Sequence, residues 1–281
     1  MAEFYMRWPG GRTKAATFSY DDGVETDVEL MKILRDNGLR GTFNINSGLF
    51  APQGTVYPPD AIHRRMTRDA VLAAYEGADM EVAIHGLTHP FLESVPRDRM
   101  VYELLRDREN LEKMFGRIIR GCALPYGTCD DAVTEALRVC GLVYCRYANH
   151  SSQSTLPSDW MALVPTAHHS DPALPGIIER FLAAPDNRPP QLLYVWGHSY
   201  EFLFDKGNNT WTAFRRICET VGGRDDVWYA TNIDIVDYER AYRALRVSLD
   251  GRLVENPSAV PVWVFAFGRT VEIGPGETKT I

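Results

Sequence analysis

Short apolar runs alternate with amphipathic helical patterns along most of this chain, and the alternation restricts the folds open to it. The strand-like runs are rich in β-forming residues and lie at 14–20, 41–46, 81–84, 142–147, 191–196 and 227–230. Helical patterns separate them, at 25–37, 67–77, 97–115, 130–140, 176–184 and 210–221. Because neighbouring parallel strands need a crossover, usually a helix, this order predicts an α/β fold with a parallel sheet.

The end of the chain has a different pattern. Leu245, Val247 and Leu249 alternate with polar residues, and the apolar run VPVWVFAF precedes the turn-rich sequence GPGETKTI. This pattern predicts a small β-hairpin appendage. We therefore expect two parts, an α/β domain over residues 1–245 and a small β appendage over residues 246–281.

Composition excludes several classes of protein. The 281 residues carry a formal net charge of −7 and no basic cluster, so nucleic-acid binding has no support. No stretch approaches the roughly 20 apolar residues that span a bilayer, and the first 20 residues lack the pattern of a signal peptide. An odd number of cysteines, five, favours reduced thiols. We expect a cytoplasmic protein without membrane or nucleic-acid partners, and the sequence leaves its oligomeric state open.

Polar residues gather where the predicted strands end. Asp21-Asp22-Gly23 follows the first strand, His85 follows the strand at 81–84, and His198 follows the strand at 191–196. The turn Pro125-Tyr126-Gly127 comes after residues 118–124. In closed α/β barrels the carboxyl ends of the strands share one mouth, so segments far apart in sequence are expected to meet there.

The pair Asp21-Asp22 is the first candidate for chemistry. Two adjacent carboxylates after a buried strand are costly unless a charge compensates them, and a divalent cation would do so. Adjacent residues that leave a strand point in different directions, so one carboxylate can bind a metal while the other stays free. The alternative is a solvated turn, since Asp-Asp-Gly suits a turn equally well.

The second candidate is the segment HGLTH, which contains His85 and His89. Two imidazoles four residues apart on one turn can share a cation, and with one carboxylate they form a common open hydrolytic metal set. Such a set accepts zinc, cobalt, nickel or manganese. Taken alone, the two histidines are more often packed or exposed.

His198 is a candidate general acid, because a histidine at a strand end titrates near neutral pH. Two other segments are candidate partners for it. The sequence VPTAHHSD contains His168 and His169, and Asp159 lies beside Trp160. An acid beside an aromatic ring can orient a histidine and wall a pocket, but Trp160 is equally suited to a core.

Over roughly residues 14–200 the chain resembles the polysaccharide deacetylases, the NodB-type carbohydrate esterases. TFSYDDG is similar to that family's motif TFDDG, HGLTH to H-[ST]-x-x-H, ALPYG to R-x-P-Y, and LLYVWGH to the last family motif. The resemblance implies a distorted (β/α) barrel. It also implies that Asp21 is the general base and that Asp22, His85 and His89 bind one divalent metal ion, zinc first among the four metals.

The same resemblance implies further roles at the mouth of the barrel. The backbone N–H of Tyr126 would help to hold an oxyanion, and His198 would act as the general acid. Pro125, Trp160 and Trp196 are the expected substrate contacts, with the apolar neighbours of His198 lining an acetyl pocket.

Two positions depart from the family pattern. Ala123 stands where the family has the arginine that holds the catalytic aspartate, and Arg146 or Arg120 is available to substitute for it. Gly86 replaces the serine or threonine that follows the first motif histidine.

The expected function is therefore metal-dependent removal of an N-acetyl or O-acetyl group from an amino sugar, oligosaccharide or glycoconjugate. A cytoplasmic location would favour small sugar conjugates over cell-wall polymer. Two alternatives stay open: hydrolysis of another amide, such as a cyclic ureide or a formyl group, and a carbohydrate-binding protein that has lost catalysis.

Overall fold

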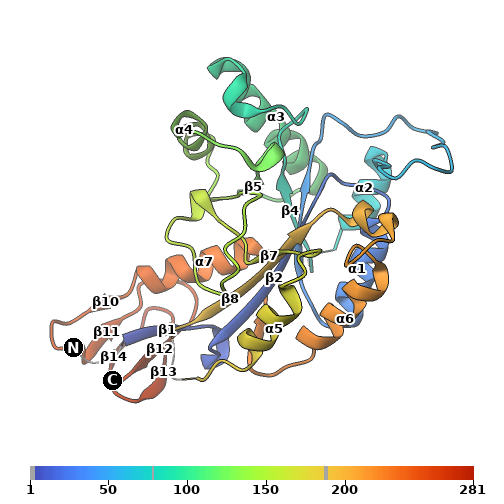
Figure 1. Ribbon diagram of the computed structural model, residues 1–281. Coiled ribbons are helices and arrows are strands. Elements are labelled where there is room, and N and C mark those ends of the chain that lie inside the picture. The colour runs from blue at the N-terminus through green and yellow to red at the C-terminus, as the bar shows by residue number, and fades with distance from the viewer. Residues whose placement is uncertain (1–3, 78, 187–188) are drawn as a thin grey trace.

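The computed structural model describes residues 4–77, 79–186 and 189–281 (Figure 1). Its helices are α1 (Asp27–Asp36), α2 (Arg68–Tyr75), α3 (Arg97–Phe115), α4 (Asp131–Val139), α5 (Leu174–Leu182), α6 (Trp211–Val221) and α7 (Asn232–Arg243). The first nine strands are β1 (Phe4–Arg7), β2 (Lys14–Asp21), β3 (Gly41–Ile45), β4 (Glu81–Ile84), β5 (Gly121–Ala123), β6 (Tyr144–Arg146), β7 (Ala167–His168), β8 (Gln191–Gly197) and β9 (Val227–Tyr229). The last five are β10 (Arg246–Val247), β11 (Leu253–Glu255), β12 (Val262–Ala266), β13 (Arg269–Ile273) and β14 (Thr278–Thr280). Short 3₁₀ turns lie at Pro9–Gly11, Leu92–Ser94, Pro125–Gly127, Trp160–Ala162 and Ser199–Phe204.

The main sheet has eight parallel strands in the order β6-β5-β4-β3-β2-β8-β7, with β9 also paired to β2. Its two edges are linked by the segment before β7. Leu163 exchanges backbone hydrogen bonds with Cys145 and Tyr147 beside β6, while Thr166 donates to the carbonyl of Tyr194 in β8. The sheet therefore curls into a distorted barrel, as predicted.

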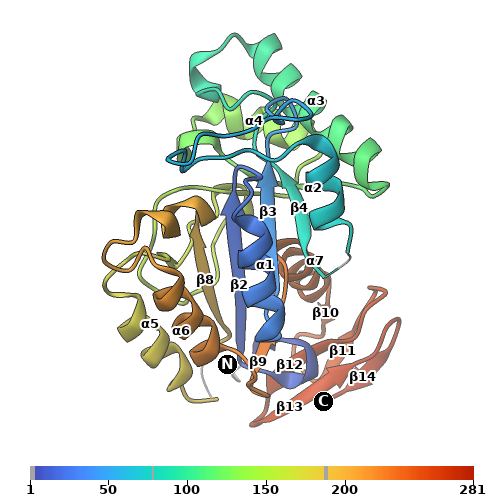
Figure 2. The same cartoon turned by 90° about the vertical axis from the view of Figure 1, so that its right-hand side faces the viewer.

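Helices cover the outside of this sheet. In Figure 2, α1, α5 and α6 lie on the side that faces the viewer, and the strands β10 to β14 form a separate layer at the lower end. Every residue of β2 is buried, as expected for a central parallel strand that is covered on both faces. Phe18 of β2 meets Phe214 of α6 edge to face at 6.2 Å, which anchors that helix on the sheet.

Local sequence explains where several helices begin. The hydroxyl of Thr67 accepts the backbone N–H of Ala70 and so caps the start of α2. The carboxylate of Asp130 and the hydroxyl of Thr210 cap α4 and α6 in the same way. Each cap satisfies one of the backbone donors left free at a helix start.

Among the elements that were not predicted are β1, β5, β7 and α7; β1 and α7 show why. The strand β1 is short and acquires its partner from β12, with Phe4 opposite Ala266. The helix α7 is capped by Thr231, and its first residues are bound to the sheet: Asn232 N–H donates to Thr42 and Ile233 N–H to Glu81. Neither long-range partnership has a local sequence signal.

The predicted β appendage is present and is larger than one hairpin. The hairpin β12–β13 takes β1 as a third strand, and β10, β11 and β14 form a second three-stranded sheet. The division of the chain at residue 245 into two domains stays a prediction. Within the described part of the chain, none of the helices has both the length and the apolar character needed to cross a membrane.

Trp8 joins the amino-terminal segment to the barrel. Its ring is fully buried between Trp228 and Tyr238, at centroid distances of 5.5 and 5.9 Å, and its indole N–H donates to the carbonyl of Gln191 at 3.0 Å. The residue thus ties the start of the chain to β8, β9 and α7.

We expect Trp8→Ala to lower the free energy of unfolding by about 3 to 5 kcal/mol, because a large buried ring is replaced by a cavity. Denaturant unfolding followed by circular dichroism measures the change. The control Leu249→Ala removes a fully exposed side chain in the appendage and should shift stability by less than about 0.5 kcal/mol. Equal unfolding midpoints for Trp8→Ala and the unmodified protein would contradict this assignment.

Candidate metal and catalytic site

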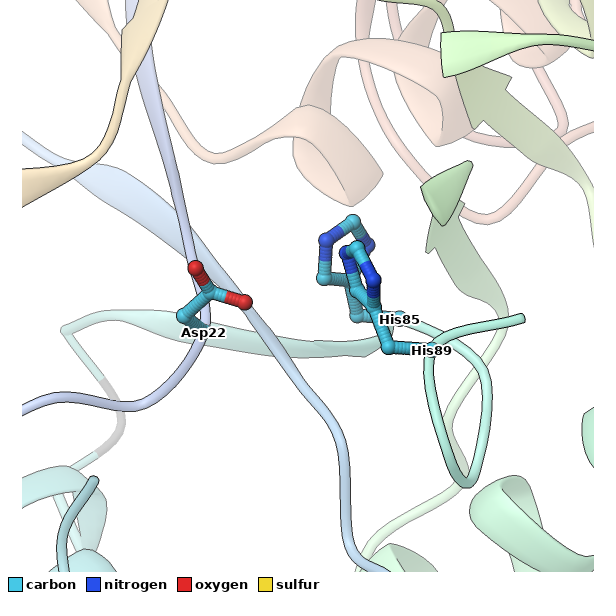
Figure 3. A group of neighbouring side chains, drawn as sticks. All are labelled: Asp22, His85 and His89. Carbon is cyan, nitrogen blue, oxygen red and sulfur yellow. The ribbon is translucent and has the colours of Figure 1, made fainter. Parts of the chain in front are cut away.

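The carboxyl ends of the parallel strands bring the candidate residues together, as the barrel pattern predicted. Asp22, His85 and His89 form a group in which one potential ligand atom from each residue lies within 4.8 Å of the others. Figure 3 shows the Asp22 carboxylate facing the two imidazole rings, which come from the loop that follows β4. The rings of His85 and His89 meet edge to face at 4.8 Å.

The hydrogen bonds of His85 leave one nitrogen available for a cation. Its Nδ1 lies 2.8 Å from the carbonyl oxygen of Ala123, which can only accept, so Nδ1 carries the proton. The opposite nitrogen, Nε2, therefore presents a lone pair. It is buried and has no hydrogen-bond partner among the described residues. A buried lone pair without a partner costs free energy, and a bound cation would remove that cost.

Asp22 is held by two side chains from the segment between β3 and α2. Arg65 donates to Asp22 Oδ1 at 3.0 Å, and His63 Nε2 lies 3.2 Å from Oδ2. Burial alone would raise the pKa of Asp22, but the contacts with His63, His85 and Arg65 outweigh it and hold the pKa far below its usual value. The carboxylate is thus ionised and oriented. His63 and Arg65 were not expected, since they lie in a segment without strand or helix periodicity.

Three of the candidate residues have a left-handed backbone. Asp22, His89 and Tyr126 have φ values of 86°, 55° and 58°. A left-handed conformation at a non-glycine residue costs roughly 1–3 kcal/mol and persists where the surroundings enforce it, commonly at functional sites. In the part of the chain that the structure describes, only three other non-glycine residues share it. The strain is therefore concentrated at the mouth of the barrel.

The replacement of the family's hydroxyl by Gly86 has a steric explanation. Gly86 has a φ of 72°, and a Cβ atom there would lie 3.2 Å from Cγ of Pro125. A serine or threonine would be strained at this φ and crowded against the proline ring. Gly86 thus allows the loop of His85 to pack against the turn of Tyr126.

Helix α3 supports the loop that carries the two histidines. Asp107 accepts the backbone N–H groups of His85 and Ser47, at 3.0 and 2.7 Å. One turn earlier, Glu103 accepts both the backbone N–H and the hydroxyl of Thr88, at 2.7 and 2.8 Å. Two buried carboxylates on one face of α3 therefore hold the loop at both ends.

Asp21 lies beside this group and is held by another set of residues. Arg146 at the end of β6 donates to Asp21 Oδ2, and Asn44 donates to Oδ1 at 2.8 Å. Burial opposes ionisation, but Arg146, His85 and His198 together hold the pKa of Asp21 below its usual value. Arg146 thus occupies the functional position of the missing motif arginine. Arg120 does not, because it pairs with Asp237.

His198 lies on the other side of Asp21, with its Nε2 3.7 Å from Asp21 Oδ2. Its Nδ1 lies 3.3 Å from Glu201 Oε1, and Glu201 Oε2 lies 3.1 Å from His168 Nε2. Burial lowers the pKa of His198, but the carboxylates of Glu201, Asp21 and Asp22 outweigh it and raise the pKa above its usual value. Glu201 is therefore the acidic partner of His198, supplied three residues later by the same turn.

The remaining candidates are divided between the site and its surroundings. Trp196 is buried under the guanidinium of Arg146, which lies 4.5 Å above its ring, and its ring centroid is 5.9 Å from that of His198. The indole N–H of Trp160 donates to Glu239 of α7, and a role of Trp160 as a substrate contact stays a prediction. Asp159 caps the turn at Trp160–Ala162.

Comparisons with known proteins agree with this geometry. The family model described as polysaccharide deacetylase matches residues 9–145, a range that includes Asp21, Asp22, His85, His89 and Tyr126. No curated protein matches the chain. A protein from Mycobacterium smegmatis, classed as a polysaccharide deacetylase, has a TM-score of 0.57 at 19% identity, covering 86% of this chain and 96% of its own.

Two further solved structures share the fold. A family 4 carbohydrate esterase from Streptomyces lividans, in complex with acetate, has a TM-score of 0.51 at 19% identity and covers 78% of this chain and 93% of its own. The esterase domain of a xylanase from the hindgut metagenome of Trinervitermes trinervoides has a TM-score of 0.51 at 14% identity, covering 81% and 92%. Residues 9–145 thus match the polysaccharide deacetylase family model, and the chain shares its fold with solved members of that family.

Proposed function

We propose that this protein is a metal-dependent deacetylase that removes an acetyl group from the nitrogen, or the oxygen, of an amino sugar in an oligosaccharide or glycoconjugate. The observation that carries the proposal is the buried Nε2 of His85, which has no hydrogen-bond partner in the described part of the chain and lies within reach of His89 and Asp22. An ionised carboxylate, Asp21, lies 3.8 Å from that nitrogen. A set of cation ligands beside a second carboxylate, which lies outside that set, suits metal-dependent hydrolysis.

Asp22, His85 and His89 would hold the cation, and their chemistry fits one. Two neutral imidazoles and one carboxylate make an open set, with zinc as the first choice and cobalt, nickel or manganese as alternatives. When bound, a divalent cation would polarise the substrate carbonyl and lower the pKa of water.

Asp21 is suited to act as the general base. Its carboxylate is ionised, and Arg146 and Asn44 fix its orientation. In the proposed reaction it takes a proton from the attacking water. Ala123, in place of the motif arginine, is the feature that favours a carbohydrate-binding protein without catalysis. The contact of Arg146 with Asp21 weakens that alternative, because another arginine holds the aspartate.

His198 and Tyr126 complete the proposed chemistry. His198, with its raised pKa, would donate a proton to the departing sugar nitrogen. The backbone N–H of Tyr126, on a left-handed turn, would donate to the oxyanion that forms on the acyl carbon. The ring of Tyr126 is half exposed and stacks on Phe91 at 3.7 Å, an aromatic surface suited to a sugar ring.

The comparisons bear on the acyl group and on the class of substrate. The esterase from Streptomyces lividans was solved with acetate, which supports an acetyl group here, and the family supports a carbohydrate substrate. Acetate release measured on N-acetylated and O-acetylated oligosaccharides, beside formate release from N-formyl analogues, separates deacetylation from the hydrolysis of another amide. The cytoplasmic location stays a prediction from the sequence.

Asp21→Asn should abolish turnover, by at least about 100-fold in kcat, because the base is removed, while one metal ion per chain stays bound. His89→Ala should lose the metal, because one of its three ligands is removed. Acetate release and metal content after dialysis measure the two effects. Full activity in Asp21→Asn would refute the assignment of the base.

Glu201→Gln should lower the pKa of His198, because it removes the carboxylate that stabilises the imidazolium. The sign follows from the raised pKa in the folded protein: the proton is held until the pH rises past that value, so the alkaline limb of kcat should move to lower pH. Histidine NMR titration and a pH–rate profile measure the shift. Asp171→Asn, which removes the partner of the surface residue His150, is the matched control and should leave both unchanged.

A further inference from the structure

We propose that His168, His198 and Glu201 form a second divalent-cation site, and that a cation bound there prevents His198 from acting as the general acid. The second half of this inference rests on the proposed function. The first half concerns binding alone. No residue of this trio belongs to the Asp22, His85 and His89 group.

The three side chains have the ligand types and spacing of a cation site. One ligand atom from each lies within 4.8 Å of the other two. The two imidazoles address different oxygens of one carboxylate, His168 Nε2 at 3.1 Å from Oε2 and His198 Nδ1 at 3.3 Å from Oε1. Two histidines and one glutamate are a known catalytic zinc set that leaves a position open.

The geometry at His198 points to an incomplete arrangement. Its Nδ1 is buried and close to Glu201, yet it makes no hydrogen bond of acceptable geometry within the described ranges. The contact between this nitrogen and the carboxylate is therefore an electrostatic one. A cation between the two groups would satisfy both.

The neighbours of the trio fit this role. Ser170 Oγ lies 2.7 Å from His168 Nδ1 and can accept its proton, which frees Nε2 to bind a cation. In the cation-free protein the Ser170 backbone N–H, 3.3 Å from Nδ1, favours the tautomer that donates to Glu201 instead. A cation on Nε2 therefore requires the His168 proton to move from Nε2 to Nδ1, so the cation and the proton compete for Nε2.

A third histidine lies close by but is not a ligand. His169 Nε2 is 3.3 Å from Glu201 Oε2 and 2.8 Å from Asn209 Oδ1, which accepts its proton. Its ring packs against Gly197, where a Cβ atom would lie 2.0 Å from Nδ1. His169 therefore lines the proposed site, and the ligands are His168, His198 and Glu201.

Access distinguishes this trio from the first group. The side chains of His168, His198 and Glu201 are 18%, 22% and 17% exposed, whereas that of His85 is 1% exposed. A cation can reach the trio from solvent and leave it again, so we expect weaker and reversible binding.

Occupation of this site would stop the proposed proton donation. With a cation on Nδ1, His198 keeps a proton only on Nε2, as a neutral ligated imidazole. Such a group gives up its proton far less readily than an imidazolium does, so the departing sugar nitrogen would not be protonated. Activity should therefore rise to a maximum at one cation per chain and fall as the second site fills.

The test is calorimetric titration of the metal-free protein with zinc chloride at pH 7, with acetate release measured at each ratio. The unmodified protein should bind two zinc ions per chain, the second at least about tenfold more weakly, as expected for an exposed set. His89→Ala should lose the tighter event and keep the weaker one. His168→Gln should lose the weaker event, keep the tighter one and lose the inhibition by excess zinc.

His150→Gln is the matched control, because His150 is an exposed histidine that belongs to neither group, and it should keep both events. Circular dichroism confirms that each variant is folded. One zinc ion per chain in the unmodified protein, or a second ion retained in both His168→Gln and Glu201→Gln, would overturn the proposal. Two bound ions without acetate release on any substrate would instead refute the proposed function and leave the second site standing.

Discussion

The buried ion pair between Arg146 and Asp21 is the interaction on which the site depends. Arg146 ends an edge strand, β6, and Asp21 ends the central strand β2, so their contact requires the sheet to curl. The guanidinium also lies 4.5 Å above the ring of Trp196 in β8. Removal of one member of a buried pair costs about 3–5 kcal/mol because the other charge is left unpaired. One arginine therefore links the shape of the barrel to the charge of the proposed base.

Buried carboxylates also join separate loops at the carboxyl ends of the strands. Asp107 joins the loop after β4 to the loop after β3, through the N–H groups of His85 and Ser47. On the other side, Asp27 accepts the backbone N–H of Val24 and the hydroxyl of Ser199, and so joins the loop after β2 to the turn of His198. Burial raises the pKa of Asp107 and Asp27 to about 7. Each of these two carboxylates thus fixes one pair of the loops that carry the candidate site residues.

The sequence predicted much of this arrangement because strand ends in a parallel barrel share one side. The strand and helix patterns from residue 14 to 230 were confirmed, with ends displaced by at most two residues. Asp22, His85 and His89 were expected to meet, and they do. Local periodicity carries this information, since each element buries its own apolar face.

What the sequence did not predict depends on contacts between distant segments. From the sequence, Arg146 and Arg120 were equal candidates to replace the motif arginine. The curl of the sheet brings Arg146 to Asp21. His63 and Arg65 reach Asp22 from an irregular segment, and Glu201 serves His198 only because a tight turn folds it back. The hydrogen bond from the indole N–H of Trp160 to Glu239 of α7 was not predicted either. Such partnerships follow from tertiary geometry alone.

The pairing of β1 with β12 has a consequence for how the chain acquires its structure during synthesis. Phe4 lies opposite Ala266, so β1 is synthesised long before the strand that pairs with it. Contacts this distant in sequence close slowly, and until then an unpaired strand edge is open to other chains. The barrel can assemble earlier around β2, whereas the sheet of β1, β12 and β13 forms only after β12 has been synthesised.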